Sequence, residues 1–189
     1  MKRGFKASAE RLAQQLREQV GSAEDTPVPL DLVAQRLNVN VLAADDIIDR
    51  SRLEELNELQ RDAFSAATFK LDSGQRVIVY NPLHEIGRTN SNIAHELAHL
   101  LLEHSVRNVE SVGNFKFLTC DSEQEEEADW LGGCLLLPRP ILYASARKGL
   151  GPGEIAERYK TSEPMARFRL NMSGVLVQVA RQRKAQGRR

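Results

Sequence analysis

The chain has 189 residues, of which 41% are hydrophobic, and this is enough to form one globular domain or one domain with a small appendage. Its 26 Lys and Arg side chains balance 26 Asp and Glu side chains, so the molecule as a whole has no net charge to attract nucleic acid or membranes. No stretch reaches the ~20 apolar residues of a membrane span. Without a secretion signal, and with only Cys120 and Cys134, the sequence predicts a cytoplasmic protein that does not associate with membranes.

The first 60 residues predict helices and one short strand. Apolar residues recur at three- and four-residue steps over 7–20 and again over 30–37, which predicts two amphipathic helices. A Pro-containing segment, Thr26-Pro27-Val28-Pro29, separates them. Residues 39–42 alternate like a strand, whereas 53–59 fit either a helix or a loop.

A β-hairpin is predicted next. Residues 63–71 and 76–80 have the pattern of strands, and Asp72-Ser73-Gly74 between them is typical of a turn. Asn81-Pro82 then turns the chain toward a helix that contains the most informative motif of the sequence.

This motif is the H-E-x-x-H sequence His95-Glu96-Leu97-Ala98-His99. Residues i and i+4 of a helix lie on one face, so both imidazoles can point at one zinc ion. Glu96 lies about 100° further around the helix, where it can take a proton from a water molecule rather than bind the metal. The alternative is an ordinary helix with two solvent-facing histidines.

A second helix is predicted to supply the third ligand. Residues 123–137 have helical periodicity and end at Pro138. Glu125 is preferred to Glu126 and Glu127 because only Glu125 has an aspartate four residues later. That aspartate, Asp129, can accept the second ring N–H of a ligand histidine.

Alternatives to this assignment stay open. The glutamates can simply form an acidic run at a helix N-terminus, where the helix dipole favours negative charge. His104 is a rival third ligand, although its five-residue separation from His99 does not match one helical turn. Gly132 and Gly133 would let the second helix approach another backbone closely, and Cys134 is interpreted as a buried small residue.

These motifs resemble those of the ImmA/IrrE metallopeptidases. The shared features are the H-E-L-x-H-L-L-L helix, a Glu-x-x-Ala-Asp segment beginning at Glu125, the end Leu135-Leu136-Leu137-Pro138, and a strand at 76–81. The resemblance covers about residues 5 to 172. Leu137 replaces the usual Met and the two glycines replace a common Ala, and neither change affects a ligand position.

The C-terminal part contains a helix-turn-helix-like unit. Residues 154–159 and 163–170 have the pattern of two helices, and Ser162 is the predicted cap of the second. Further back in the chain, residues 105–122 form a connector without clear periodicity, and connectors of this length are often functional. Arg167 and Arg169 are the candidates for contact with nucleic acid or a partner. Substrate docking or a structural role is favoured over DNA binding.

The sequence therefore predicts an α+β fold, in which a small, mostly antiparallel sheet packs on helices and the zinc site lies between two of them. The expected organisation is a metallopeptidase domain over 1–150, the helix-turn-helix-like unit over 151–175, and a basic tail over 176–189, which is expected to be frayed from Arg181 onward.

The predicted function is that of a zinc endopeptidase, with His95, His99 and Glu125 as ligands and Glu96 as general base. The resemblance implies that the substrate is a helix-turn-helix (XRE-type) repressor, cut to lift repression in a stress or mobile-element response. The rival function is a DNA-binding regulator with structural or sensory zinc. The oxyanion-stabilising group is not identified; Tyr143, Tyr159 and His84 are weak candidates.

Overall fold

The computed structural model describes residues 1–23, 25–60, 64–104, 108–112, 115–119 and 121–186. The α+β class is confirmed, with a three-stranded sheet in the order β1-β3-β2. β2 (Ala66–Lys70) and β3 (Arg76–Tyr80) form the predicted antiparallel hairpin, whose turn contains Gly74 at a φ of 84°. β1 (Val39–Ala43) runs parallel to β3, so this sheet is mixed. The parallel pair arises because the chain crosses over between β1 and β3 instead of turning back directly.

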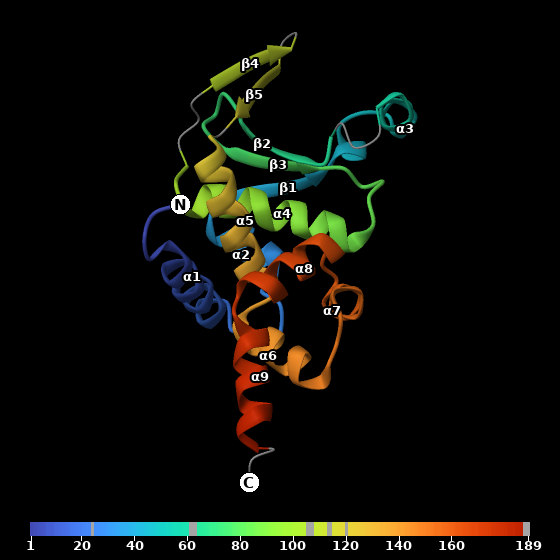
Figure 1. The fold of residues 1–189 in the computed structure, drawn as a ribbon. Helices are drawn as coiled ribbons and strands as arrows, with labels where there is room; N and C mark the ends of the chain where they lie inside the picture. Colours follow the sequence, from blue (N-terminus) through green and yellow to red (C-terminus); the bar gives the residue numbers. More distant parts are fainter. Residues whose placement is uncertain (24, 61–63, 105–107, 113–114, 120, 187–189) are drawn as a thin grey trace.

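The long helix α4 (Ile86–Leu101) lies along the sheet, and α5 (Ser122–Leu136) crosses α4 (Figure 1). Ile93, Leu97 and Ala98 form the buried stripe of α4 and share one core with Leu131 and other side chains of α5. The predicted N-terminal helices are present as α1 (Phe5–Gln19) and α2 (Leu30–Arg36), and α1 packs on α5. This packing places α4 between the sheet and the C-terminal helices (Figure 1).

The predicted close approach of α5 is present at Gly132. A Cβ added there would lie 3.1 Å from the backbone carbonyl of Ala94 and 3.2 Å from the backbone nitrogen of His95. A side chain at this point would press on the backbone of α4, which cannot move away easily. Glycine therefore lets the two helices touch next to the first motif histidine.

The C-terminal end of α5 is held by two buried arginines. Arg17 donates from Nη2 to the carbonyl of Leu135 at 3.2 Å, and Arg169 donates from Nη2 to the carbonyl of Leu137 at 3.1 Å. The last carbonyls of a helix have no partner within it and carry its negative dipole end, so both contacts are favourable. They fix α5 to α1 and to α8 (Glu163–Met172).

A second core joins the C-terminal helices α6 (Arg139–Lys148), α7 (Pro152–Tyr159), α8 and α9 (Val175–Gln186) below α4 and α5 (Figure 1). α7 and α8 correspond to the predicted helix-turn-helix-like pair, and the Ser162 hydroxyl accepts a hydrogen bond from the Met165 N–H as the predicted cap. The prediction of a frayed end from Arg181 was wrong for residues 181–186, which belong to α9. Val175 and Val179 are one turn apart and buried, so they anchor a helix.

Two other segments, whose secondary structure the sequence did not define, form regular elements. The ambiguous 53–59 segment belongs to α3 (Arg50–Leu59), which buries only Leu53 and stands away from the sheet after the short turn η1 (Ala44–Asp46). Within its described residues, the 105–122 connector contains β4 (Asn108–Val112) and β5 (Phe115–Thr119), which pair antiparallel and which the absence of clear periodicity did not indicate.

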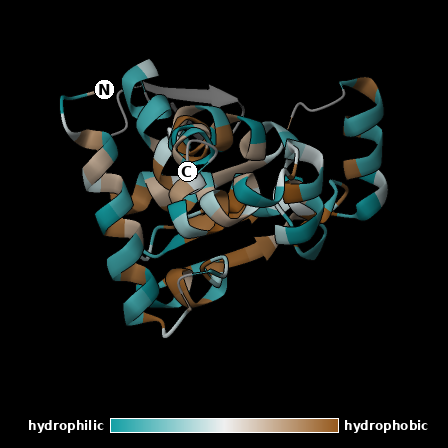
Figure 2. Cartoon of the chain, turned by 60° about the horizontal axis from the view of Figure 1, so that its bottom comes forward, coloured by the Kyte–Doolittle hydropathy of each residue, from teal (hydrophilic) through white to brown (hydrophobic). Residues whose placement is uncertain are grey.

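Hydropathy follows this architecture. Figure 2 shows hydrophobic stretches in the central strands and the helices around them, with hydrophilic residues along the outer helices. Within the described residues, no helix combines the length and apolar character that crossing a bilayer requires.

Candidate metal centre

Three side chains of α4 and α5 converge on one point. His95 Nε2 lies 3.0 Å from His99 Nε2 and 3.1 Å from Glu125 Oε2, and His99 Nε2 lies 3.5 Å from Glu125 Oε1. Zinc bonds of ~2.1 Å at tetrahedral angles place ligand atoms about 3.4 Å apart. Two imidazole nitrogens and a carboxylate at these separations therefore fit a zinc ion, and the three residues can hold a metal.

The local sequence explains why α5 presents Glu125 there. Asp121 caps the helix, since its Oδ1 accepts a hydrogen bond from the Gln124 N–H at 2.9 Å. Glu125 then falls in the first turn, and the contact at Gly132 sets the distance of α5 from α4. The helix start and the helix crossing together bring the carboxylate to the histidines.

Asp129 lies behind the first histidine. Its Oδ1 is 2.8 Å from Nδ1 of His95, on the opposite side of the ring from the convergence point. A ring N–H donated to this carboxylate leaves the Nε2 lone pair directed at the other two groups. The structure thus brings together the residues predicted to act together here, His95, His99, Glu125 and Asp129.

His104 contacts the second histidine from behind and does not enter the cluster. Its Nδ1 is 2.9 Å from Nδ1 of His99, and its Nε2 is 3.5 Å from Glu127 Oε2. The chain returns because Glu103 adopts a left-handed φ of 52° just after α4 ends. Sequence reasoning missed this role, since a positive φ at a glutamate has no clear sequence signal.

The two motif histidines have opposite proton affinities in the metal-free protein. Burial disfavours the charged form of His95, but hydrogen bonds to Asp129 and Glu125 outweigh burial and raise its pKa to about 10. Burial and the charge of His95 lower the pKa of His99 to about 4. The hydrogen bond from His95 also lowers the pKa of Glu125. In the metal-free protein His95 is therefore a charged imidazolium, with one ring N–H toward Asp129 and the other toward Glu125, and the Nε2 proton must leave before a metal binds there.

Glu96 faces the sheet side of the cluster. The hydroxyl of Thr68, on β2, donates a hydrogen bond to Glu96 Oε2 at 2.5 Å. Burial raises the pKa of Glu96, and the Thr68 hydrogen bond acts against this rise. Thr68 is a second residue that sequence reasoning missed, because only the position of β2 beside α4 brings it to the motif.

A cavity of about 530 Å³ opens beside these groups, between β2, α4 and α8. It meets a cavity of about 850 Å³ that continues toward α7, and together they form a groove. Asn92 lines both parts, and its buried Nδ2 has no hydrogen-bond partner in the described structure. The first cavity is lined by β2-side residues, motif residues and α8 residues that include Ser65, Ala66, His95, Glu96, Met165 and Phe168.

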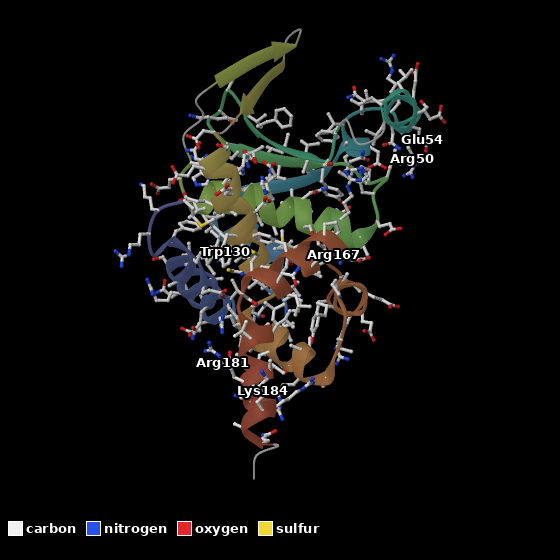
Figure 3. The ribbon with its side chains drawn as sticks, viewed as in Figure 1. Arg50, Glu54, Trp130, Arg167, Arg181 and Lys184 are labelled. Carbon is white, nitrogen blue, oxygen red and sulfur yellow. The ribbon has the colours of Figure 1, made fainter. Side chains whose placement is uncertain are left out.

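The two arginines predicted to contact nucleic acid or a partner differ. Arg167 is exposed on α8 and pairs with Glu163 at 2.5 Å (Figure 3). Arg169 is completely buried, bonded to Glu10 Oε1 at 2.8 Å and stacked near Trp130. Arg169 therefore cannot reach a nucleic acid, because α8 turns it toward the core.

The weak oxyanion candidates lie elsewhere. Tyr143 donates a hydrogen bond to Gln182 on α9, and Tyr159 lines a separate cavity behind α4. Neither these tyrosines nor His84 is among the described residues that line the groove. Cys134 is buried as predicted, and burial raises the pKa of its thiol.

Comparison with known proteins agrees with this geometry. The family model Peptidase_M78, described as an IrrE N-terminal-like domain, matches residues 34–171. No curated protein gives a significant match. A solved structure of a Mycobacterium tuberculosis transcriptional regulator is similar, with a TM-score of 0.50 and 13% identity over 87% of this chain and 46% of that chain. The chain thus spans just under half of that protein, and the similarity concerns the fold alone.

Proposed function

The chain belongs to the Peptidase_M78 family of IrrE N-terminal-like zinc metallopeptidases, and we propose from this membership that the groove is its active site. His95, His99 and Glu125 would hold the zinc ion, and the convergence of their three ligand atoms is the observation that carries the proposal. A zinc ion in such a site supplies Lewis-acid chemistry for attack of water on a peptide carbonyl. Asp129 and His104 orient the two imidazoles from behind.

Glu96 acts as the general base. It accepts a proton from the attacking water and passes it to the amine that leaves when the C–N bond breaks. A carboxylate in water is a weak base near neutral pH, and burial raises the pKa of Glu96 toward a more useful range. The Thr68 hydroxyl holds the carboxylate in place.

Asn92 binds the substrate backbone or the developing oxyanion. It lies one turn before His95 and Glu96 on α4 and lines the groove, and its buried Nδ2 has no hydrogen-bond partner among the described residues. A buried donor without an acceptor is costly, so an acceptor supplied by the substrate would be favourable there. This assignment replaces Tyr143, Tyr159 and His84.

The proposed substrate is a helix-turn-helix repressor in the cytoplasm, cut once so that repression is lifted. The resemblance to ImmA/IrrE peptidases supports this substrate, and the position of α8 supports recognition of an extended protein segment. Met165 and Phe168 give the α8 wall of the groove an apolar surface. We propose accordingly that residues 151–175 form a docking unit on a peptidase domain of residues 1–150.

The ligand assignment is tested by metal content. Glu125→Ala should lose zinc, whereas His104→Ala should keep it when zinc is in excess. If His104→Ala loses the metal and Glu125→Ala keeps it, the ligand set is wrong.

The substrate is tested by incubating the zinc-loaded protein with any helix-turn-helix repressor encoded beside its gene, with unrelated repressors and with unfolded casein. A single cut in the neighbouring repressor, absent with Glu96→Gln, supports the proposal. Rapid degradation of casein without preference for any repressor contradicts it.

A further inference from the structure

The balanced charge of the chain conceals two oppositely charged parts. Residues 139–189 contain 12 Lys and Arg against three Asp and Glu, whereas residues 1–138 contain 14 against 23. The C-terminal part thus has a formal charge of +9 and the rest −9. No acidic residue follows Glu163 in the sequence. Such separation creates a strong local potential even though the total is zero.

The positive charge is concentrated on α6 and α9. Six exposed side chains form what we call the C-terminal basic surface: Arg139, Arg147, Lys148, Arg181, Arg183 and Lys184. None of the six pairs with a carboxylate within the described part of the chain. Their hydrogen bonds go to neutral acceptors, so their charges stay uncompensated.

One of these hydrogen bonds brings the two helices together. Arg183 donates from Nη2 to the backbone carbonyl of Arg147 at 3.0 Å, next to Lys148. Arg139 donates to the carbonyl of Ser173 and to the side chain of Gln178. Like charges gathered on two packed helices repel one another, and a polyanion that contacts several of them would relieve the repulsion.

The shape of α9 favours duplex nucleic acid over a flat anionic surface. α9 buries only Val175 and Val179 and then projects from the body (Figure 1), with Arg181 and Lys184 extending from it (Figure 3). At ~100° per residue, Arg181 lies about 160° around the helix from Arg183, and Lys184 lies about 100° from it. Cations therefore flank α9 on both sides, as the two phosphate strands flank a helix in the major groove.

A membrane surface would require a different helix. A helix that lies on a bilayer separates apolar and basic residues onto opposite faces. In α9 the basic residues are interspersed around the same sides as Leu176 and Val177, which are exposed. We propose that the C-terminal basic surface binds the phosphate backbone of duplex DNA, with α9 as the inserted helix.

Binding of this kind is sequence-independent and salt-sensitive. The test is fluorescence anisotropy with a labelled duplex of about 30 base pairs and arbitrary sequence, between about 50 and 200 mM salt. The variant Arg181→Gln/Arg183→Gln/Lys184→Gln keeps helix-forming residues and removes three cations. Its affinity at the lowest salt should fall at least about tenfold, and its slope of log K against log salt should flatten by about 2.7.

Arg167→Gln on α8 and Arg50→Gln on α3 are matched controls, because both remove an exposed arginine that pairs with a glutamate. Both should bind DNA like the unchanged protein. Unchanged zinc content and circular dichroism establish that the triple variant is folded.

The proposal is overturned if the unchanged protein does not bind the duplex at the lowest salt, or if the triple variant binds equally well. It is also overturned if Arg167→Gln alone reproduces the loss, since the DNA surface would then lie on α8. Vesicles containing phosphatidylserine are the last probe. Binding to vesicles but not to DNA would identify a membrane surface instead.

Discussion

The candidate metal centre and the C-terminal basic surface hold their charges in opposite ways. At the centre, His95 lies between two carboxylates and Glu96 is fixed by Thr68. On the basic surface, Arg181 and Lys184 are exposed and without carboxylate partners among the described residues. Partly buried, hydrogen-bonded charges act strongly on one neighbour, whereas exposed charges act weakly and are screened by salt. Single substitutions should therefore have large effects at the centre and small ones at the surface.

The largest expected effect is that of Glu96→Gln. Glutamine keeps the shape but cannot accept the proton, so peptide cleavage should fall by about 10²- to 10⁴-fold. Zinc content, measured on the same sample, should stay that of the unchanged protein. Cleavage near the original rate would remove Glu96 from the mechanism and weaken the contrast between the two regions.

Two arginines of α8 test the contrast within one helix. Arg169 is buried against Glu10 and the end of α5, so Arg169→Ala should lower the free energy of unfolding by about 3–5 kcal/mol. Arg167 is 60% exposed, and Arg167→Ala should change the free energy of unfolding by no more than about 0.5 kcal/mol. Urea unfolding of the zinc-free proteins measures both, and equal values would contradict the assigned burial.

A smaller effect is expected behind the cluster. His104→Ala removes the partner of His99 Nδ1 and should weaken zinc binding by about 10- to 100-fold without abolishing it. Competition with a chelator gives the affinity. Glu127 Oε2 lies 3.5 Å from His104 Nε2, on the side of His104 away from His99. Glu127→Gln should therefore also weaken zinc binding, but less than His104→Ala does. Unchanged affinity in His104→Ala would show that the contact has no positioning role.

The raised pKa of His95 also predicts a pH dependence of the metal-free protein. The pKa of His95 is raised from 6.5 to about 10 on folding, so its ion pairs stabilise the protein fully below about pH 6.5. This contribution is lost as the pH rises toward 10. The urea midpoint should fall between pH 6.5 and 10, and His95→Gln should remove that part of the fall. A midpoint that rises over this window would contradict the assignment.

Helical periodicity explains how much of the site was predictable. Spacing alone placed His95 and His99 on one face, and the i, i+4 relation to Asp129 distinguished Glu125 from its neighbours. Thr68, Asn92 and His104 were not predictable, because they reach the site through strand position, groove shape and a left-handed glutamate.

The fold shows the same division between local and non-local information. Local patterns predicted the helices α1, α2, α4 and α5 and the β2–β3 hairpin. The parallel β1–β3 pair depends on a distant crossover, and α9 depends on burial of Val175 and Val179 against α6. Arg169 was misread for the same reason, since an arginine on a helix gives no local indication that it will be buried.

The division of the metal ligands between α4 and α5 has a consequence for how much of this protein a cell retains. An ion held by His99 and Glu125 joins positions 26 residues apart and closes a loop in the chain, as a covalent cross-link would. An ion that binds only the folded form adds about 4 kcal/mol of stability at a thousandfold excess over its dissociation constant. Zinc starvation would then increase the unfolded fraction, on which cellular proteases act. The zinc supply would thus set the abundance of the protein as well as its activity.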